Sequence, residues 1–268
     1  MGNEHDQQRL ASNECEVPAH ACALAIMAKA PRVGAVKTRL VPPLSPAEAA
    51  ELSRCFIRDV TGNIAELMSD ARVRGVVAYT PFGMEDAFDG LLPGGFRLLA
   101  QRGDDLGERL RHAGEDLFAA GFEAICLINS DSPTMPTSLL EEAVASLQAP
   151  GERVVLGAAA DGGYYLIGLK RAYGHLFHAI DWSTERVFGQ TLERAADLGL
   201  TVDRLPVWYD VDDAASLRDL CKDLFSGTLP PACNGLSGYG APATSRFLRQ
   251  LLAVDGTGKR LGLRLHLS

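Results

Sequence analysis

ACALAIMA, residues 21–28, is a short apolar run that leads directly into KAPRVGAVKTR, residues 29–39. An apolar run of this length, bounded by a loop with Pro and Gly, is typical of a strand buried on both faces of a parallel sheet. The loop also concentrates positive charge on a chain whose formal net charge is −8. A local anion site is therefore possible on an acidic protein.

The same change from apolar run to polar loop recurs along the chain. Residues 45–48, Ser-Pro-Ala-Glu, combine an N-cap Ser, Pro at the first helical position and Glu at the third, which predicts a helix reaching about residue 68. Further strands are predicted at 73–79, 96–100, 124–129, 154–159, 164–169 and 201–205, and further helices at 105–120, 138–147, 183–198 and 213–225. This alternation predicts an α/β fold with a mainly parallel central sheet.

One connection departs from that pattern. Asp161-Gly162-Gly163 is too short for a helical crossover between strands 154–159 and 164–169. These two strands are therefore either not neighbours in the sheet or an antiparallel pair.

A single domain with two tails is the simplest organisation, with 47% hydrophobic residues and 22% charged residues. Residues 1–20 are polar and lack periodicity, which predicts an N-terminal extension. The domain then covers residues 21–226. Residues 227–268 are rich in Pro, Gly and Ser around a short amphipathic stretch at 246–254, and are expected to be a C-terminal appendage.

Several function classes are disfavoured by composition. There is no apolar run of about 18 residues and no secretion signal, so we expect no membrane insertion. The six cysteines lie far apart without metal-ligand spacing, which predicts reduced thiols in a cytoplasmic protein. The net charge of −8 argues against nucleic-acid binding. No His lies in the polar loops after the strands, which disfavours a Ser-His-Asp hydrolase.

Ligands of open parallel sheets bind beyond the carboxyl ends of the strands, so the loops there are informative. In the first of these loops, Lys29, Lys37 and Arg39 can meet phosphate oxygens, and Gly34 permits close approach of the backbone. The spacing is not that of a P-loop. A solvated basic turn is the alternative interpretation.

Acidic residues follow two other strands. Asp131, in Asn-Ser-Asp-Ser-Pro at 129–133, stands at a strand end and either binds a cation or forms a turn and caps the next helix. In Trp-Tyr-Asp-Val-Asp-Asp at 208–213, either Asp212 or Asp213 is expected to cap the following helix. The other carboxylates, including Asp210, are metal candidates.

Two more loops carry ligand-binding groups. Asp161, Gly162, Gly163 and Tyr164 can hydrogen-bond a ligand and cover it with a ring, although a tight turn is equally natural for this sequence. Arg109 can face a phosphate or pair with an acidic neighbour, Glu108 or Asp105.

Six ordered motifs taken together resemble a known bacterial family. They are AKAPRVGAVKTRL (28–40), GDDLGERL (103–110), NSDSP (129–133), ADGGYYLIGL (160–169), WST (182–184) and WYDVD (208–212). The family is the GT-A glycosyltransferase-like family of formerly unknown function, some of whose members are assigned to arsenosugar biosynthesis. It is related to the molybdenum-cofactor and phospholactate guanylyltransferases. The resemblance covers about residues 22–225 and implies a single GT-A, nucleotide-diphospho-sugar transferase domain.

The resemblance also implies roles for individual residues. Lys29, Lys37 and Arg39 would lie against nucleotide phosphates, Asp131 would hold Mg²⁺ or Mn²⁺, and Asp210 or Asp212 would add a second carboxylate. Asp161, Gly162, Gly163, Tyr164 and Trp182 would face the acceptor. The residues expected to take part in catalysis are Asp131, Lys37 and Asp161.

The expected activity is metal-dependent glycosyl transfer from a nucleotide sugar to a small-molecule acceptor. Nucleotidyl transfer with release of pyrophosphate is one alternative, and a nucleotide-binding module without catalysis is another. Asp131→Asn is expected to abolish turnover but to keep or raise the stability of the ligand-free protein, because repulsion by Asp210 and Asp212 would be relieved.

Overall fold

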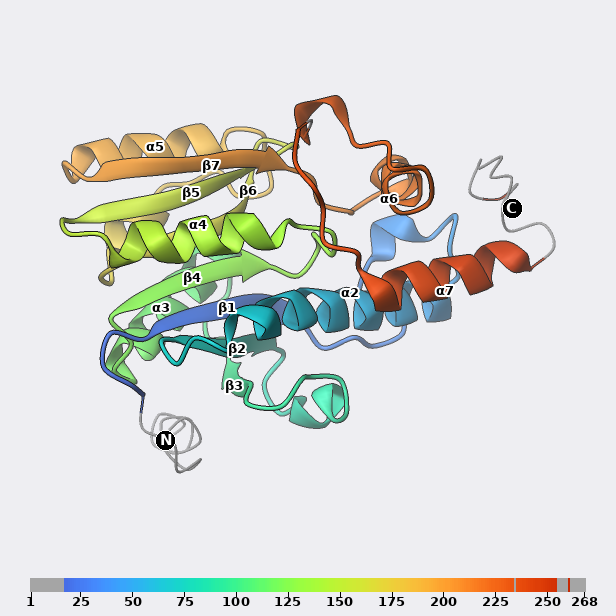
Figure 1. Ribbon diagram of the computed structural model, residues 1–268, viewed down its shortest axis with the longest axis horizontal. Helices are drawn as coiled ribbons and strands as arrows, with labels where there is room; N and C mark the ends of the chain where they lie inside the picture. The colour runs from blue at the N-terminus through green and yellow to red at the C-terminus, as the bar shows by residue number, and fades with distance from the viewer. Residues whose placement is uncertain (1–16, 234, 255–259, 261–268) are drawn as a thin grey trace.

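The computed structural model describes residues 17–233, 235–254 and 260, and a seven-stranded sheet forms its centre (Figure 1). The strands are β1 (Cys22–Lys29), β2 (Val73–Thr80), β3 (Arg97–Ala100), β4 (Ala124–Asn129), β5 (Arg153–Ala159), β6 (Tyr164–Leu169) and β7 (Thr201–Trp208). Their order in the sheet is β3-β2-β1-β4-β6-β5-β7. The predicted α/β domain with a mainly parallel sheet is confirmed.

Strand β6 is the one strand of the sheet that runs against its neighbours. It is antiparallel to β4 on one side and to β5 on the other, whereas the remaining pairs are parallel. The short link through Asp161, Gly162 and Gly163 therefore joins an antiparallel pair, which is one of the two arrangements that its length allowed.

Helices cover both faces of the sheet. They are α2 (Pro46–Leu67), α3 (Leu106–Ala119), α4 (Thr137–Gln148), α5 (Val187–Asp197), α6 (Ala214–Ser226) and α7 (Pro242–Ala253), with short 3₁₀ turns η1 (Thr38–Leu40), η2 (Glu85–Phe88), η3 (Gly174–Phe177) and η4 (Pro231–Cys233). The predicted start of α2 is confirmed: the Ser45 hydroxyl accepts a hydrogen bond from the Glu48 backbone N–H, and the Glu48 carboxylate accepts one from the Ser45 N–H.

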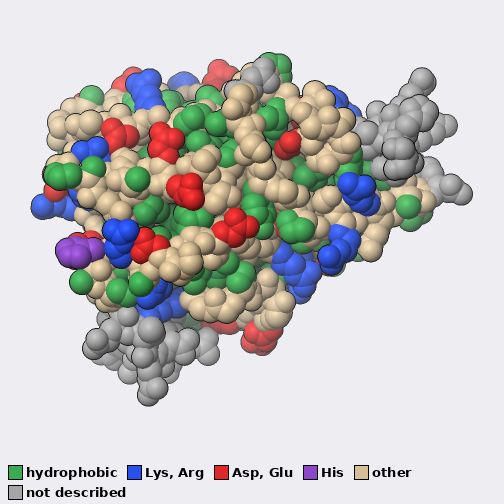
Figure 2. Space-filling model, viewed as in Figure 1, with side chains coloured by type: hydrophobic (Ala, Val, Ile, Leu, Met, Phe, Trp, Pro, Cys, Tyr) green, Lys and Arg blue, Asp and Glu red, His purple; other side chains and the backbone are tan. Residues whose placement is uncertain are grey.

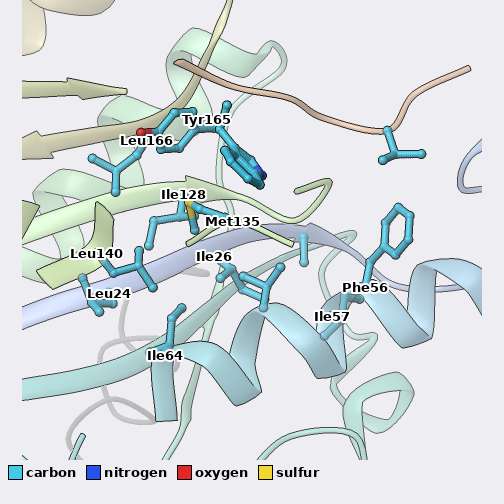
Figure 3. Close-up of a cluster of buried hydrophobic side chains, with 14 of the residues drawn as sticks. Leu24, Ile26, Phe56, Ile57, Ile64, Ile128, Met135, Leu140, Tyr165 and Leu166 are labelled. Atoms are coloured by element: carbon cyan, nitrogen blue, oxygen red, sulfur yellow. The ribbon is translucent and has the colours of Figure 1, made fainter. Parts of the chain in front are cut away.

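Side chains of β1 alternate between two apolar cores because successive residues of a strand point to opposite faces. Leu24 and Ile26 pack with α2, α4, α6 and α7, while Ala23 and Ala25 face α3 and α5. The first core is seen in Figure 3, where side chains of α2 meet those of β1 and β4. The sheet is buried on both faces, as expected for parallel strands.

Two elements differ in length from the sequence-based prediction. Helix α5 begins at Val187 rather than at residue 183, because a turn precedes it in which Ser183 has φ of +63°. Strand β7 continues through Pro206 to Trp208. Proline is tolerated there because β7 lies at the edge of the sheet, where one side of the strand needs no N–H donor.

The residues that follow α6 pack on the same core. The buried carboxylate of Asp59 in α2 accepts hydrogen bonds from the backbone N–H groups of Ala243 (2.9 Å) and Thr244 (2.7 Å), which begin α7. Leu248 of α7 is fully buried. Helix α7 is therefore fixed against α2 by a capping carboxylate and by apolar packing.

Charge is unevenly distributed over the surface. In the view of Figure 2, acidic side chains lie over α4, whereas basic side chains gather around α7, which exposes Arg246 and Arg249. Among the described residues, no helix is long and apolar enough to span a membrane.

Candidate active site

A cleft opens where the chain changes direction across the sheet. The chain passes from β1 to β2 on one side and later returns to β4 on the other side of β1. Parallel sheets bind ligands at such a switch point, beyond the carboxyl ends of the strands. The cleft has a volume of about 380 Å³. Its polar and charged lining consists of Lys29, Lys37, Thr38, Arg39, Ser53, Thr80, Gln101, Arg109, Asn129, Ser130, Asp131 and Asp212.

The cleft brings together most of the residues predicted to bind the nucleotide. Lys29, Lys37, Arg39 and Arg109 all line it. Gly34 does not, but its φ of +77° shows that the loop needs a residue without a side chain there. The acceptor residues Asp161, Gly162, Gly163, Tyr164 and Trp182 lie outside this lining, as does Asp210.

Lys37 points inward rather than into solvent. Its ammonium group donates to the carbonyl oxygen of Val211 (2.7 Å) and contacts Asp131 (2.8 Å) and Asp212 (3.2 Å). The Lys37 side chain lines the cleft but is only 6% exposed. The ion pairs join the loop after β1 to the loops after β4 and β7.

Asp131 does not cap the helix that follows it. Helix α4 begins after Pro136 and has no side-chain cap. The Asp131 carboxylate instead contacts Lys37 and accepts a hydrogen bond from the Ser130 hydroxyl (3.2 Å). The Asp131 backbone is held by the Asn129 side chain, which accepts from its N–H (3.3 Å), and by Val211, whose N–H donates to the Asp131 carbonyl (2.9 Å).

Asp213 is the residue that caps α6. Its carboxylate accepts hydrogen bonds from the backbone N–H groups of Ala215 (2.9 Å) and Ser216 (2.8 Å). Those bonds lower the pKa of Asp213. Asp212 is left free of capping and pairs with Lys37 and Arg39.

Asp210 lies among other carboxylates. Burial, followed by repulsion from Asp161, Asp212 and Asp131, raises the pKa of Asp210 to about 7. Asp161, on the loop between β5 and β6, thus acts on Asp210 together with the carboxylates after β4 and β7.

The donor set suits a divalent cation that arrives with a phosphate ligand. Among the described residues, no three His, Cys, Asp or Glu side chains are arranged to hold a metal ion by themselves. Mg²⁺, however, is commonly bound by one or two carboxylates together with water and substrate phosphates. Asp131 with Asp210 or Asp212 fits that pattern, because they offer hard carboxylate oxygens, and Asp131 and Asp212 both raise the pKa of Asp210 by repulsion.

Two basic residues of the cleft, Lys29 and Arg109, are not used in ion pairs with any residue that the structure describes. Arg109 donates to the carbonyl oxygens of Gly103 (3.1 Å) and Asp104 (3.3 Å), so it does not form the ion pair with Glu108 or Asp105 that was one of its two interpretations. Asp105 instead caps α3 by accepting from the Glu108 N–H. In the described part of the chain, no carboxylate pairs with Lys29 or Arg109.

The predicted acceptor loop is a tight turn. The Asp161 carboxylate accepts from the Gly163 N–H (2.9 Å), and Gly162 has φ of +93°. A Cβ on Gly162 would lie 2.5 Å from the Glu185 carbonyl oxygen, whereas Gly163 is not in the left-handed region. Gly162 is therefore the glycine that the turn requires.

Tyr164, which directly follows this loop, packs against Trp182. Their rings meet edge-on, with centroids 6.4 Å apart. Trp182 also lies on the first turn of α3, where a Cβ on Gly107 would come within 2.5 Å of the indole nitrogen. The two rings connect the loop after β5 to the helix that carries Arg109.

Some polar residues of the cleft were not among the site residues predicted from the sequence. Thr80 ends β2, Gln101 follows β3 directly and Asn129 ends β4, so all three line the cleft from strand ends. All three stand at the carboxyl ends of strands, where ligand-binding residues of parallel sheets are found. Ser53, in the first half of α2, carries no such signal.

Comparisons with known proteins bear on the family and the fold of this chain. The family model described as "Uncharacterized protein conserved in bacteria (DUF2064)" matches residues 63–184. No curated protein matches the chain. A solved structure from Desulfovibrio desulfuricans G20, provisionally assigned as a nucleotide-diphospho-sugar transferase, is 31% identical, with 87% of this chain and 95% of that chain covered and a TM-score of 0.71.

A second solved structure shows the same fold at greater distance. CMP:2-keto-3-deoxy-manno-octonic acid synthetase, complexed with CTP, is 13% identical, with 78% of this chain and 100% of that chain covered and a TM-score of 0.51. The fold predicted from the sequence is confirmed. This chain belongs to the same family as the Desulfovibrio desulfuricans protein and has the nucleotide-diphospho-sugar transferase fold.

Proposed function

We propose that the protein transfers a glycosyl group from a nucleotide sugar to a small-molecule acceptor. The observation that supports this most is that cations and carboxylates line one cleft at the switch point. Lys29 and Arg109 line this cleft without carboxylate partners among the described residues, and Asp131 lines it as well. A diphosphate has the charge and the size to lie between them.

The basic residues would bind and orient the donor. Lys29, Arg109 and the exposed guanidinium of Arg39 can contact phosphate oxygens, and the backbone near Gly34 can approach them closely. Donors fixed in advance by protein contacts stabilise charge that develops on a leaving group. Arg109 is fixed in this way, because two backbone carbonyls hold its guanidinium.

The acidic residues would serve the metal and the acceptor. Mg²⁺ or Mn²⁺ held by Asp131 with Asp210 or Asp212 would supply positive charge to the leaving diphosphate. Asp161 would accept the proton of an acceptor hydroxyl, with Gly162 and Gly163 shaping the turn that presents it. Tyr164 and Trp182 would support that turn from behind.

Product analysis tests the proposal. The protein is incubated with nucleotide sugars, Mn²⁺ and a set of small hydroxylated acceptors, and products are identified by mass spectrometry. Glycosyl transfer releases a nucleoside diphosphate and adds one sugar to the acceptor. Release of pyrophosphate from a nucleoside triphosphate would instead show nucleotidyl transfer, in line with the resemblance to guanylyltransferases. Nucleotide binding that is insensitive to chelator, without turnover, would show a binding module.

A further inference from the structure

The three N–H bonds of the Lys37 ammonium group are matched by three acceptors. The carbonyl of Val211 lies at 2.7 Å, Asp131 at 2.8 Å and Asp212 at 3.2 Å. An ammonium group has three donors and no acceptor. No N–H of Lys37 is left over for a phosphate oxygen.

The surroundings hold Lys37 in that position. Its side chain is 6% exposed, and its ammonium group lies 5.2 Å from the ring centroid of Phe56, within cation–π range. The Lys37 backbone has φ of +49° and ψ of +36°, a left-handed conformation that is uncommon for a residue with a side chain. This conformation stands at the start of η1, and the side chain reaches Val211, Asp131 and Asp212 from it.

Lys29 is the natural comparison, because it is a lysine of the same loop that lines the same cleft. Its side chain is exposed, and no described carboxylate forms an ion pair with it. The two lysines therefore face different charges: Lys37 faces carboxylates, and Lys29 faces the open cleft.

We propose that Lys37 is a positioning residue that serves as the fixed counter-cation of Asp131 and Asp212 and does not bind the donor phosphates. This inference rests on the proposed function, in which Asp131 belongs to the metal side of the site. Lys37 ties the loop after β1 to those after β4 and β7, so that the carboxylates keep their places. It also opposes the binding of a divalent cation in the absence of nucleotide, because like charges repel at close range.

Lys37→Met tests this role, with Lys29→Met as the matched control. In titrations of Mn²⁺ without nucleotide, Lys37→Met should bind Mn²⁺ at least about tenfold more tightly than wild type, since a unit positive charge is removed beside the carboxylates. Lys29→Met should change Mn²⁺ affinity by less than about threefold. With EDTA present, UDP and GDP should bind Lys29→Met about tenfold more weakly, but Lys37→Met should retain nearly wild-type affinity.

Labelling of the wild-type protein gives a second measurement that does not depend on how the variants fold. Acetic anhydride followed by mass spectrometry should modify Lys29 readily and Lys37 hardly at all in the free protein. UDP or GDP should then protect Lys29 and leave Lys37 unchanged.

The opposite results would overturn the inference. Lys37 would be a phosphate ligand if it were labelled in the free protein and protected by nucleotide, or if Lys37→Met lost as much metal-free nucleotide affinity as Lys29→Met with unchanged Mn²⁺ affinity. The labelling of free protein and the Mn²⁺ titrations need no donor and no turnover. Failure of the proposed transferase reaction would therefore leave these results interpretable.

Discussion

Asp210 combines burial with repulsion from neighbouring carboxylates, and its pKa of about 7 makes stability depend on pH. The folded protein binds a proton at Asp210 more tightly than the unfolded chain does, because the pKa of this carboxyl in the unfolded chain is near 3.8. Stability contributed by this group is therefore full below about pH 4 and is lost as pH rises through 7. Asp210→Asn removes that loss and should be more stable than wild type by about 1–3 kcal/mol at pH 8, as measured by urea unfolding.

At pH 5 the difference between Asp210→Asn and wild type should nearly vanish, because wild-type Asp210 is then protonated. Asp213→Asn is the control from the same loop. Hydrogen bonds from Ser216 lower the pKa of Asp213, so its contribution is full above the unfolded value and changes little between pH 5 and pH 8. A difference at Asp210 that did not vary with pH would show that this carboxyl is ionised throughout.

Asp131→Asn should reduce the stability of the ligand-free protein by about 1 kcal/mol. The sequence suggested equal or raised stability, since repulsion from Asp210 and Asp212 is relieved. The structure adds a larger opposing effect, because Asp131 contacts the nearly buried ammonium of Lys37 at 2.8 Å. Urea unfolding in EDTA measures the sign, and a more stable variant would mean that repulsion outweighs the ion pair.

The sequence predicted which residues belong to the site better than it predicted where their side chains point. Either Asp212 or Asp213 was expected to cap α6, because Asp before a helix satisfies its free N–H groups, and Asp213 does so. The inward course of Lys37 could not be expected, because it depends on a left-handed backbone at a lysine and on partners 94 and more residues away. Such partners become neighbours through the sheet order, which local sequence does not encode.

At the scale of elements, Gly107 in α3 has no room for a side chain. A Cβ there would lie 2.5 Å from the Trp182 indole nitrogen. Gly107→Ala should therefore displace Trp182 and cost about 1–3 kcal/mol, with a shift in tryptophan fluorescence. Arg109 lies in the same first turn of α3, so nucleotide affinity should fall as well.

Gly189→Ala is the matched control in α5. A Cβ there meets nothing within 4 Å, and the backbone is not left-handed. Alanine should stabilise the helix by about 0.5–1 kcal/mol without changing fluorescence or nucleotide affinity. Equal effects of both substitutions in urea unfolding would show that Trp182 does not fill the space beside Gly107.

Most element positions followed from local pattern. Strands β4 and β6 match their predicted ranges, since short apolar runs bounded by polar loops leave little choice of ends. The start of α5 was misplaced because Ser183 and Thr184 are residue types that often cap helices. The chain forms a turn there instead, and the helix begins at Val187. The packing of α7 on α2 depends on Asp59, which mid-helix sequence gives no reason to select.

At the scale of the whole molecule, ligand binding at the switch point should stabilise every element that meets there. A nucleoside diphosphate at about 100 times its Kd adds about 2.7 kcal/mol, which corresponds to a rise in Tm of about 5–10 °C for a domain of this size. Mn²⁺ should increase the rise further, because Asp131 and its neighbours then share a cation with the phosphates. Thermal shift with UDP and GDP, with and without Mn²⁺, measures both contributions.

Two variants separate those contributions in the same assay. Asp131→Asn should keep the rise caused by nucleotide in EDTA and lose the increment caused by Mn²⁺, because Asn lacks the charge that a hard cation requires. Lys29→Met should lose part of the rise in EDTA, because a cation facing the phosphates is gone. If Asp131→Asn kept the full Mn²⁺ increment, the metal would bind elsewhere, and the assignment of Asp131 as a metal ligand would be wrong.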